Sequence, residues 1–68
     1  MTQHERILRY LDEFGSISPI EAFRDLGITK LATRISEMTR RGGRFEKEPM
    51  TAKNRYGETV HYMRYRRA

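Results

Sequence analysis

Glycines divide the first 43 residues into three short segments, and each segment carries apolar residues at helical spacing. Gly15, Gly27 and the pair Gly42-Gly43 follow these runs, where a left-handed residue commonly ends a helix. The spacing therefore predicts three small helices, at about residues 3–13, 19–26 and 30–41.

Two of the three helices have clear start signals. Thr2 is followed three residues later by Glu5, and Ser18 by Glu21, which is the spacing of a capping box. Pro19 fits the first position of the second helix, because its ring already holds a helical φ. The short segment Ser16-Ile17-Ser18, which lies between two helix breaks, is expected to form a small edge strand.

The third helix, with Thr29 as its expected N-cap, separates apolar from polar residues most clearly. Its apolar positions are expected to face the core, and its opposite face is short, polar and positively charged. The second helix has an apolar side as well. The apolar positions of the three helices are Ile7, Leu8, Leu11 and Phe14 in the first, Ile20, Phe23 and Leu26 in the second, and Leu31, Ile35 and Met38, with Ala32 beside them, in the third.

After Gly43 the pattern changes to that of a β-hairpin at about residues 44–66. Asn54 and Gly57 bracket a turn between two stretches rich in β-formers. Pro49 cannot donate a backbone hydrogen bond, so its strand lies at a sheet edge or is interrupted there. In the last strand Met63 and Tyr65 share one side, and Val60 and Tyr62 share the other. Alternation does not decide between them, and the side of Met63 and Tyr65 is favoured as the one that faces the core.

Charge is distributed unevenly along the chain of 68 residues. Residues 1–29 carry a net charge of −2 and residues 30–68 one of +7. This separation indicates a surface for a polyanion. The alternative explanation is that the excess of arginine only keeps the protein in solution.

Two short helices joined by Leu26-Gly27-Ile28-Thr29 have the layout of a helix-turn-helix, which presents its second helix to the major groove of DNA. The whole chain is expected to form one α+β domain, residues 1–68, of the winged helix-turn-helix class, with the hairpin as the wing. Four segments also resemble a family of small phage and prophage helix-turn-helix proteins: Gly15 to Ala22, Leu26 to Ile35, Lys53 to Gly57 and Tyr62 to Arg66. Glu48 to Met50 is less β-like than that family's first wing strand. The resemblance implies a DNA-binding protein, without identifying its target or its regulatory role.

Double-stranded DNA is thus the expected partner of a small phage-type regulator or excisionase-like architectural factor. Lys30, Thr33 and Arg34 are expected to read bases, and Arg40 and Arg41 to contact phosphates. The wing tip is expected to follow the backbone or the minor groove. The candidate DNA-binding residues are Thr29, Lys30, Thr33, Arg34, Glu37, Arg40, Arg41, Lys53, Asn54, Arg55, Tyr56 and Arg64. A structural ion pair of Arg34 with Asp12 or Glu37 is the alternative for that side chain.

Other functions find less support in the sequence. A protein-binding module that engages an acidic surface of a host or phage protein is the main alternative. Single-stranded nucleic acid or RNA binding is a weaker one, based on the interleaved Tyr and Arg of the last strand. No catalytic residues, metal site or cofactor are expected, since His4 and His61 lie in different elements and cysteine is absent. No apolar run has the length of a membrane span, so a cytoplasmic protein is expected, and the oligomeric state stays open.

Overall fold

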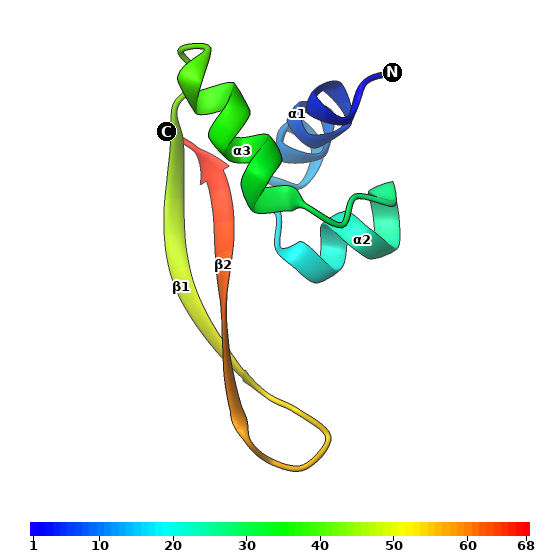
Figure 1. Cartoon of the computed structure of the whole chain (residues 1–68), viewed down its shortest axis with the longest axis vertical. Helices are drawn as coiled ribbons and strands as arrows, with labels where there is room; N and C mark the ends of the chain where they lie inside the picture. Colours follow the sequence, from blue (N-terminus) through cyan, green and yellow to red (C-terminus); the bar gives the residue numbers. More distant parts are fainter.

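The computed structural model describes residues 1–68 and contains three helices followed by one hairpin. The elements are α1 (Gln3–Phe14), α2 (Pro19–Leu26), α3 (Leu31–Arg40), β1 (Phe45–Lys53) and β2 (Thr59–Arg67). Figure 1 shows the helices gathered at one end, while the hairpin runs past α3 and then extends well beyond them. This arrangement confirms the predicted α+β fold with a C-terminal wing.

Capping boxes start the first two helices, as predicted. The hydroxyl of Thr2 accepts from the backbone N–H of Glu5 at 3.1 Å, and the Glu5 carboxylate accepts from the Thr2 N–H at 3.0 Å. Ser18 and Glu21 repeat the arrangement at 3.4 and 2.9 Å, with Pro19 at the first helical position. Each box satisfies amides that a helix start otherwise leaves free.

The predicted N-cap of the third helix was wrong. Lys30, not Thr29, holds the cap position, because the Lys30 carbonyl accepts the first helical bond from the N–H of Arg34 at 3.1 Å. Thr29 therefore lies one residue outside the position from which a side chain caps, and no side chain caps α3. The helix ends at Arg40, one residue earlier than expected, followed by Gly42 at φ +96°.

One hydrophobic cluster joins all three helices to β2. Its ten buried residues are Ile7, Tyr10, Leu11, Ile17, Ala22, Ile28, Leu31, Ile35, Met38 and Tyr65. The inward turn of Leu31, Ile35 and Met38 confirms the orientation predicted for α3.

The apolar side of α2 does not face this core. Ile20 and Phe23 are 66% and 59% exposed, whereas the small side chain of Ala22 is fully buried and Leu26 is half-buried. Ala22 and Leu26 lie one turn apart, so they form the inward stripe. Because Ala22 is small, the α2 backbone can approach its neighbours closely, and the larger apolar residues are left on the surface.

The hairpin pairs Phe45 with Arg67 at its base and Lys53 with Thr59 near its tip. Ile17 forms a single antiparallel bridge to Tyr65 with two 2.8 Å hydrogen bonds, which confirms the short strand expected before α2. Tyr65 is buried as predicted, but Met63 is 40% exposed, and its expected burial was wrong. The reason is the length of the wing, since Met63 lies two residues nearer the tip than Tyr65, in the part of the hairpin that extends past α3 (Figure 1).

Pro49 lies at a sheet edge, which resolves the two possibilities left by the sequence. It stands opposite Met63 within a continuous β1 strand. The backbone N–H and C=O of Tyr65 bond to Ile17, on the side away from β1. The backbone groups of every second β2 residue from Thr59 to Tyr65 therefore point away from β1, and those of their partners in β1 point away from β2. The missing N–H of Pro49 therefore faces the outer edge, where no ladder bond is lost.

Candidate nucleic-acid interface

The outer face of α3 and the turn before it consists of short or flexible polar side chains. Thr29, Lys30, Thr33 and Arg40 are all exposed, as predicted for residues that meet a groove. No large apolar side chain interrupts this face, because those of α3 are buried. An α-helix with such a face can enter the major groove and approach the base edges.

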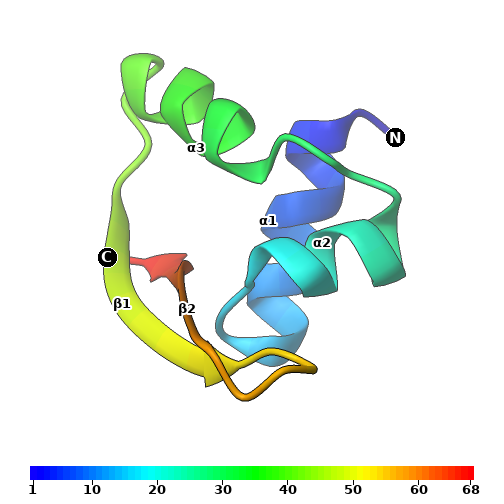
Figure 2. The ribbon, with the colours of Figure 1, turned by 60° about the horizontal axis from the view of Figure 1, so that its bottom comes forward.

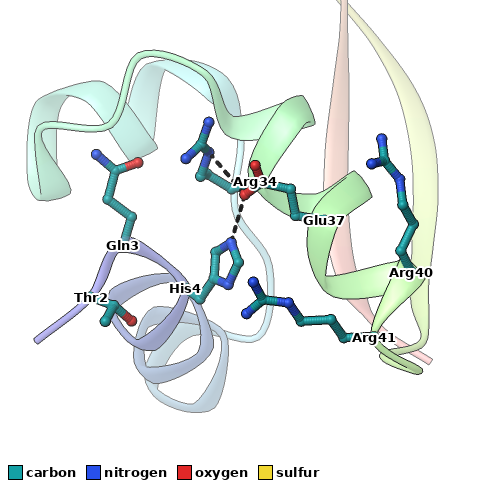
Figure 3. Close-up of a pocket in the computed structure, with 7 residues that line it drawn as sticks. All are labelled: Thr2, Gln3, His4, Arg34, Glu37, Arg40 and Arg41. Atoms are coloured by element: carbon teal, nitrogen blue, oxygen red, sulfur yellow. Dashed lines mark hydrogen bonds and ion pairs between the residues drawn. The ribbon is translucent and has the colours of Figure 1, made fainter.

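Glu37 lies one turn after Thr33 and Arg34 one turn after Lys30, and both side chains border the N-terminus of α1. The Nε of Arg34 lies 3.4 Å from Oε1 of Glu37, and Nε2 of His4 donates to the same oxygen at 2.8 Å (Figure 3). The hydrogen bond from His4 lowers the pKa of Glu37, and the charge of Arg34 lowers it further. Arg34 is thus held in the ion pair with Glu37, which was the structural alternative given above.

A polar cleft of about 580 Å³ separates the start of α1 from α3. Arg41 extends into this cleft toward His4, whereas Arg40 lines its border and extends away from His4 (Figure 3). The cleft contains no hydrophobic side chain. Arg40 and Arg41 therefore place cations on two flanks of α3, where phosphates of a bound duplex would run.

The wing tip is shaped by Asn54 and presents its neighbours to solvent. The Asn54 side-chain oxygen accepts from the N–H groups of Tyr56 and Glu58 at 2.9 and 3.0 Å. Lys53 donates to the hydroxyl of Thr59 at 2.7 Å, while Arg55 has no acidic partner and Tyr56 is 80% exposed. Asn54 is therefore a turn residue, and Lys53, Arg55 and Tyr56 form the accessible part of the tip.

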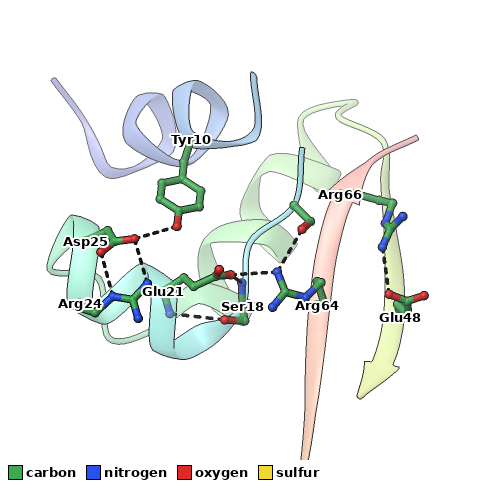
Figure 4. Close-up of polar contacts among 9 residues, drawn as sticks. Tyr10, Ser18, Glu21, Arg24, Asp25, Glu48, Arg64 and Arg66 are labelled. Atoms are coloured by element: carbon green, nitrogen blue, oxygen red, sulfur yellow. Dashed lines mark hydrogen bonds and ion pairs between the residues drawn. The ribbon is translucent and has the colours of Figure 1, made fainter. Parts of the chain in front are cut away.

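Arg64 is held by the scaffold. Its guanidinium donates to Glu21 at 2.9 Å and to the hydroxyl of Ser16 at 3.0 Å (Figure 4). Burial raises the pKa of Glu21, but the hydrogen bonds from Ser18 and the charge of Arg64 outweigh it, so the net pKa is lowered. The wing is thereby tied to the cap of α2.

The remaining cations are distributed unevenly. Six of the fourteen Lys and Arg side chains have an acidic partner within 4 Å: Arg9, Arg24, Arg34, Arg64, Arg66 and Arg67. The eight without one are Arg6, Lys30, Arg40, Arg41, Arg44, Lys47, Lys53 and Arg55. Seven of these eight lie from Lys30 to Arg55, at the two ends of α3, in the following turn and on the wing.

Sequence reasoning missed a second groove beside α3. Ser36, Thr39 and Arg40 line it from the helix and Lys47 from β1, around a volume of about 390 Å³. Helical spacing alone places Ser36 on a flank of this face, one turn from Thr33. The position of Lys47 depends on the register of β1 against β2, which residue types did not fix.

Comparison with known families identifies the domain type. A family model described as a winged helix-turn-helix domain matches residues 2–66. No curated protein and no solved structure matches the chain. None of the helices has the length and apolar character required to cross a bilayer.

Proposed function

Because the chain belongs to the winged helix-turn-helix domain family, whose fold is of a DNA-binding, non-enzymatic kind, we propose that it binds double-stranded DNA with α3 in the major groove. The observation that carries the proposal is the concentration of cations without acidic partners between Lys30 and Arg55. Lys30, Arg40, Arg41 and Arg44 lie at the ends of α3, the one helix whose outer face is free of large apolar groups, and Lys47, Lys53 and Arg55 lie on the wing. Such a surface attracts the phosphate backbone from both sides of a groove.

The contacts divide into base reading and phosphate binding. Lys30 and Thr33, near the start of α3, would meet base edges, and Ser36 would follow one turn later. Arg40 and Arg41 would contact phosphates, together with the uncapped amides at the start of α3.

The wing would contribute affinity without sequence preference. Lys53, Arg55 and Tyr56 would follow the backbone or the minor groove. We assign Arg34, Glu37 and Arg64 to support of the interface, since each is engaged in an ion pair within the chain.

The biological role we propose is that of a small phage-type transcriptional regulator or an architectural factor. Selection of bound sequences from a random duplex pool separates the two roles. A regulator enriches one defined site, whereas an architectural factor enriches flexible steps and bends the duplex.

Fluorescence anisotropy with a labelled random duplex at two salt concentrations tests DNA binding. We expect the affinity for DNA to fall as the salt concentration rises. In Arg55→Ala the slope of log affinity against log salt concentration should become shallower by about one, equally for all DNA sequences. Arg9→Ala is the matched control, because it removes the same charge from α1, where Arg9 pairs with Glu13 at 3.1 Å. Absence of binding at low salt would overturn the proposal and leave the protein-binding alternative.

Base reading has its own test. Lys30→Ala should lower the discrimination between base pairs at one position of the selected site by about 1–3 kcal/mol. Arg34→Ala should leave the selected sequence unchanged. An unchanged preference in Lys30→Ala would place base reading elsewhere on the chain.

A further inference from the structure

An apolar groove of about 590 Å³ lies between α2 and the outer half of the wing, away from α3 and next to the wing tip. Figure 2 shows the wing curving beneath α2 at this place. The groove is lined by Pro19, Ile20, Phe23, Ala52, Val60 and Tyr62, and none of these is charged. Ile20, Phe23 and Val60 leave large apolar side chains in water, and an exposed cluster of this kind commonly marks a binding surface.

An open strand edge borders the same groove. Tyr65 already bonds outward to Ile17, and alternation along β2 points the N–H and C=O groups of Thr59, His61 and Met63 to the same outer edge. No other strand covers them, because the sheet has only two strands and the chain leaves this edge where α2 begins at Pro19. Five residues of β2 are therefore available for pairing.

The opposite edge of the wing is protected. Pro49 removes one donor from the outer edge of β1, and Lys47 and Lys53 lie two and four residues from it on the same edge. Proline and lysine are among the residues with which natural sheets block pairing at an edge. The edge of β2 between Thr59 and Met63 carries neither residue.

We propose that this edge and the groove beside it bind an extended peptide segment of a partner protein as an added strand. Backbone groups of the segment pair with those of Thr59, His61 and Met63. Alternate side chains of the segment enter the groove beside Ile20 and Phe23. This mode of recognition combines main-chain hydrogen bonds with pockets for every second side chain.

The size of the free edge favours a single strand over a second copy of this chain. If the β2 edges of two copies paired antiparallel, the wing tip of each copy would meet the start of α2 in the other. The reason is that only five residues of β2 lie between the wing tip and the start of α2. An isolated extended segment ends or turns there without this conflict.

The charges predict the composition of the segment. Lys53 and Arg55 adjoin the open end of the edge and have no acidic partner. A segment with apolar residues at alternate positions would fill the groove, and acidic residues at its end nearest the wing tip would face Lys53 and Arg55.

Selection from a displayed random-peptide library against the full chain tests the proposal. We expect enrichment of sequences with alternating apolar residues and flanking Asp or Glu. His61→Pro should weaken the binding of an enriched peptide at least about tenfold, because it removes a donor from the open edge. It should leave the hairpin intact, since residue 61 makes no ladder bond to β1.

Thr51→Pro is the matched control, because Thr51 stands opposite His61 and its N–H faces the other edge. It should change peptide affinity less than about twofold. Phe23→Ser alters the groove at an exposed position on α2 and provides a second variant if a proline variant fails to fold. We expect it to weaken binding as well.

Three outcomes would overturn the inference. One is a library that yields no enriched peptide, and another is equal affinity of the enriched peptides for the wild type, His61→Pro and Phe23→Ser. The third is a wild-type dimer in sedimentation velocity that His61→Pro converts to a monomer, which would identify a second copy as the occupant. None of these outcomes affects DNA binding, so the proposed function is tested separately.

Discussion

The guanidinium of Arg64 donates to the carboxylate of Glu21 over 2.9 Å, and the same carboxylate oxygen accepts from the backbone N–H of Ser18. One acidic side chain thus caps α2 and anchors β2, across 43 positions of sequence (Figure 4). Side chains of both partners are about one-quarter exposed, so water screens this pair less than a surface ion pair. This contact joins β2 to α2, in addition to the bridge between Ile17 and Tyr65.

Arg64→Ala should therefore destabilise the fold by about 1–2 kcal/mol, because it removes charged hydrogen bonds to Glu21 and Ser16. Arg66→Ala is the control two residues away on the same strand, where the pair with Glu48 is more exposed. We expect less than about 1 kcal/mol from it. Urea unfolding of both variants measures the difference, and equal losses would contradict the anchoring role.

Acid should unfold the protein partly through Glu21 and Asp25. Hydrogen bonds from Ser18 and the charge of Arg64 lower the pKa of Glu21 against its burial, and the bond from Arg24, followed by that from Tyr10, lowers the pKa of Asp25. A carboxylate whose pKa is lowered in the folded state contributes stability at pH values above its pKa in the unfolded chain, which is near 4.5 for Glu and 3.8 for Asp.

This stability is lost as the pH falls through the lowered pKa of each carboxyl. Glu21→Gln should flatten the decrease in unfolding free energy below about pH 4.5, as measured by urea unfolding at several pH values. A pH dependence as steep as that of the wild type would show that Glu21 is not involved.

Tyr10 should ionise only at high pH. Its hydroxyl donates to Asp25 at 2.7 Å, and this bond, with burial and the nearby carboxylates, raises its pKa to about 12. The folded state favours the neutral phenol, so this group contributes to the stability of the fold at pH values below the ordinary tyrosine pKa of 10. That contribution is lost as the pH rises from 10 toward 12.

Ultraviolet titration of the tyrosines should show one step near pH 12 that Tyr10→Phe removes. Asp25→Asn offers a second check, because it removes the carboxylate charge that helps to suppress ionisation. A titration of the wild type without a late step would refute the assignment.

Gly43 should not tolerate a side chain. A Cβ atom built there lies 2.9 Å from the carbonyl oxygen of Met38 and 3.0 Å from the ring of Phe45. Gly43→Ala should destabilise the turn between α3 and β1 by about 1–3 kcal/mol. Gly42→Asn is the comparison, since Gly42 has a positive φ of +96° in open space and Asn tolerates that region. A melting temperature lowered more by Gly42→Asn would reverse this order.

The limits of the first two helices and the presence of the wing could be predicted because their causes are local. Thr2 with Glu5, and Ser18 with Glu21, satisfy amides within three residues, and Asn54 closes its turn within four. The inward face of α3 was also predictable, since helical spacing fixes which side chains share a side.

Several features of the site depended on tertiary contacts. His4 meets Glu37 from 33 residues away, and that contact, with the ion pair to Glu37, holds Arg34 beside α1. Arg64 could be assigned to the scaffold only after β2 was placed beside α2.

The sequence by itself determined the three helices, the caps of the first two, the hairpin and the cationic second half, because backbone hydrogen bonding and helical spacing act over a few residues. The tertiary structure alone decided which cations remain free, and it left Ile20 and Phe23 outside the core. The physical reason is that ion pairs and the rotation of α2 depend on how the elements pack, and a small buried Ala22 packs α2 more closely than either larger side chain would.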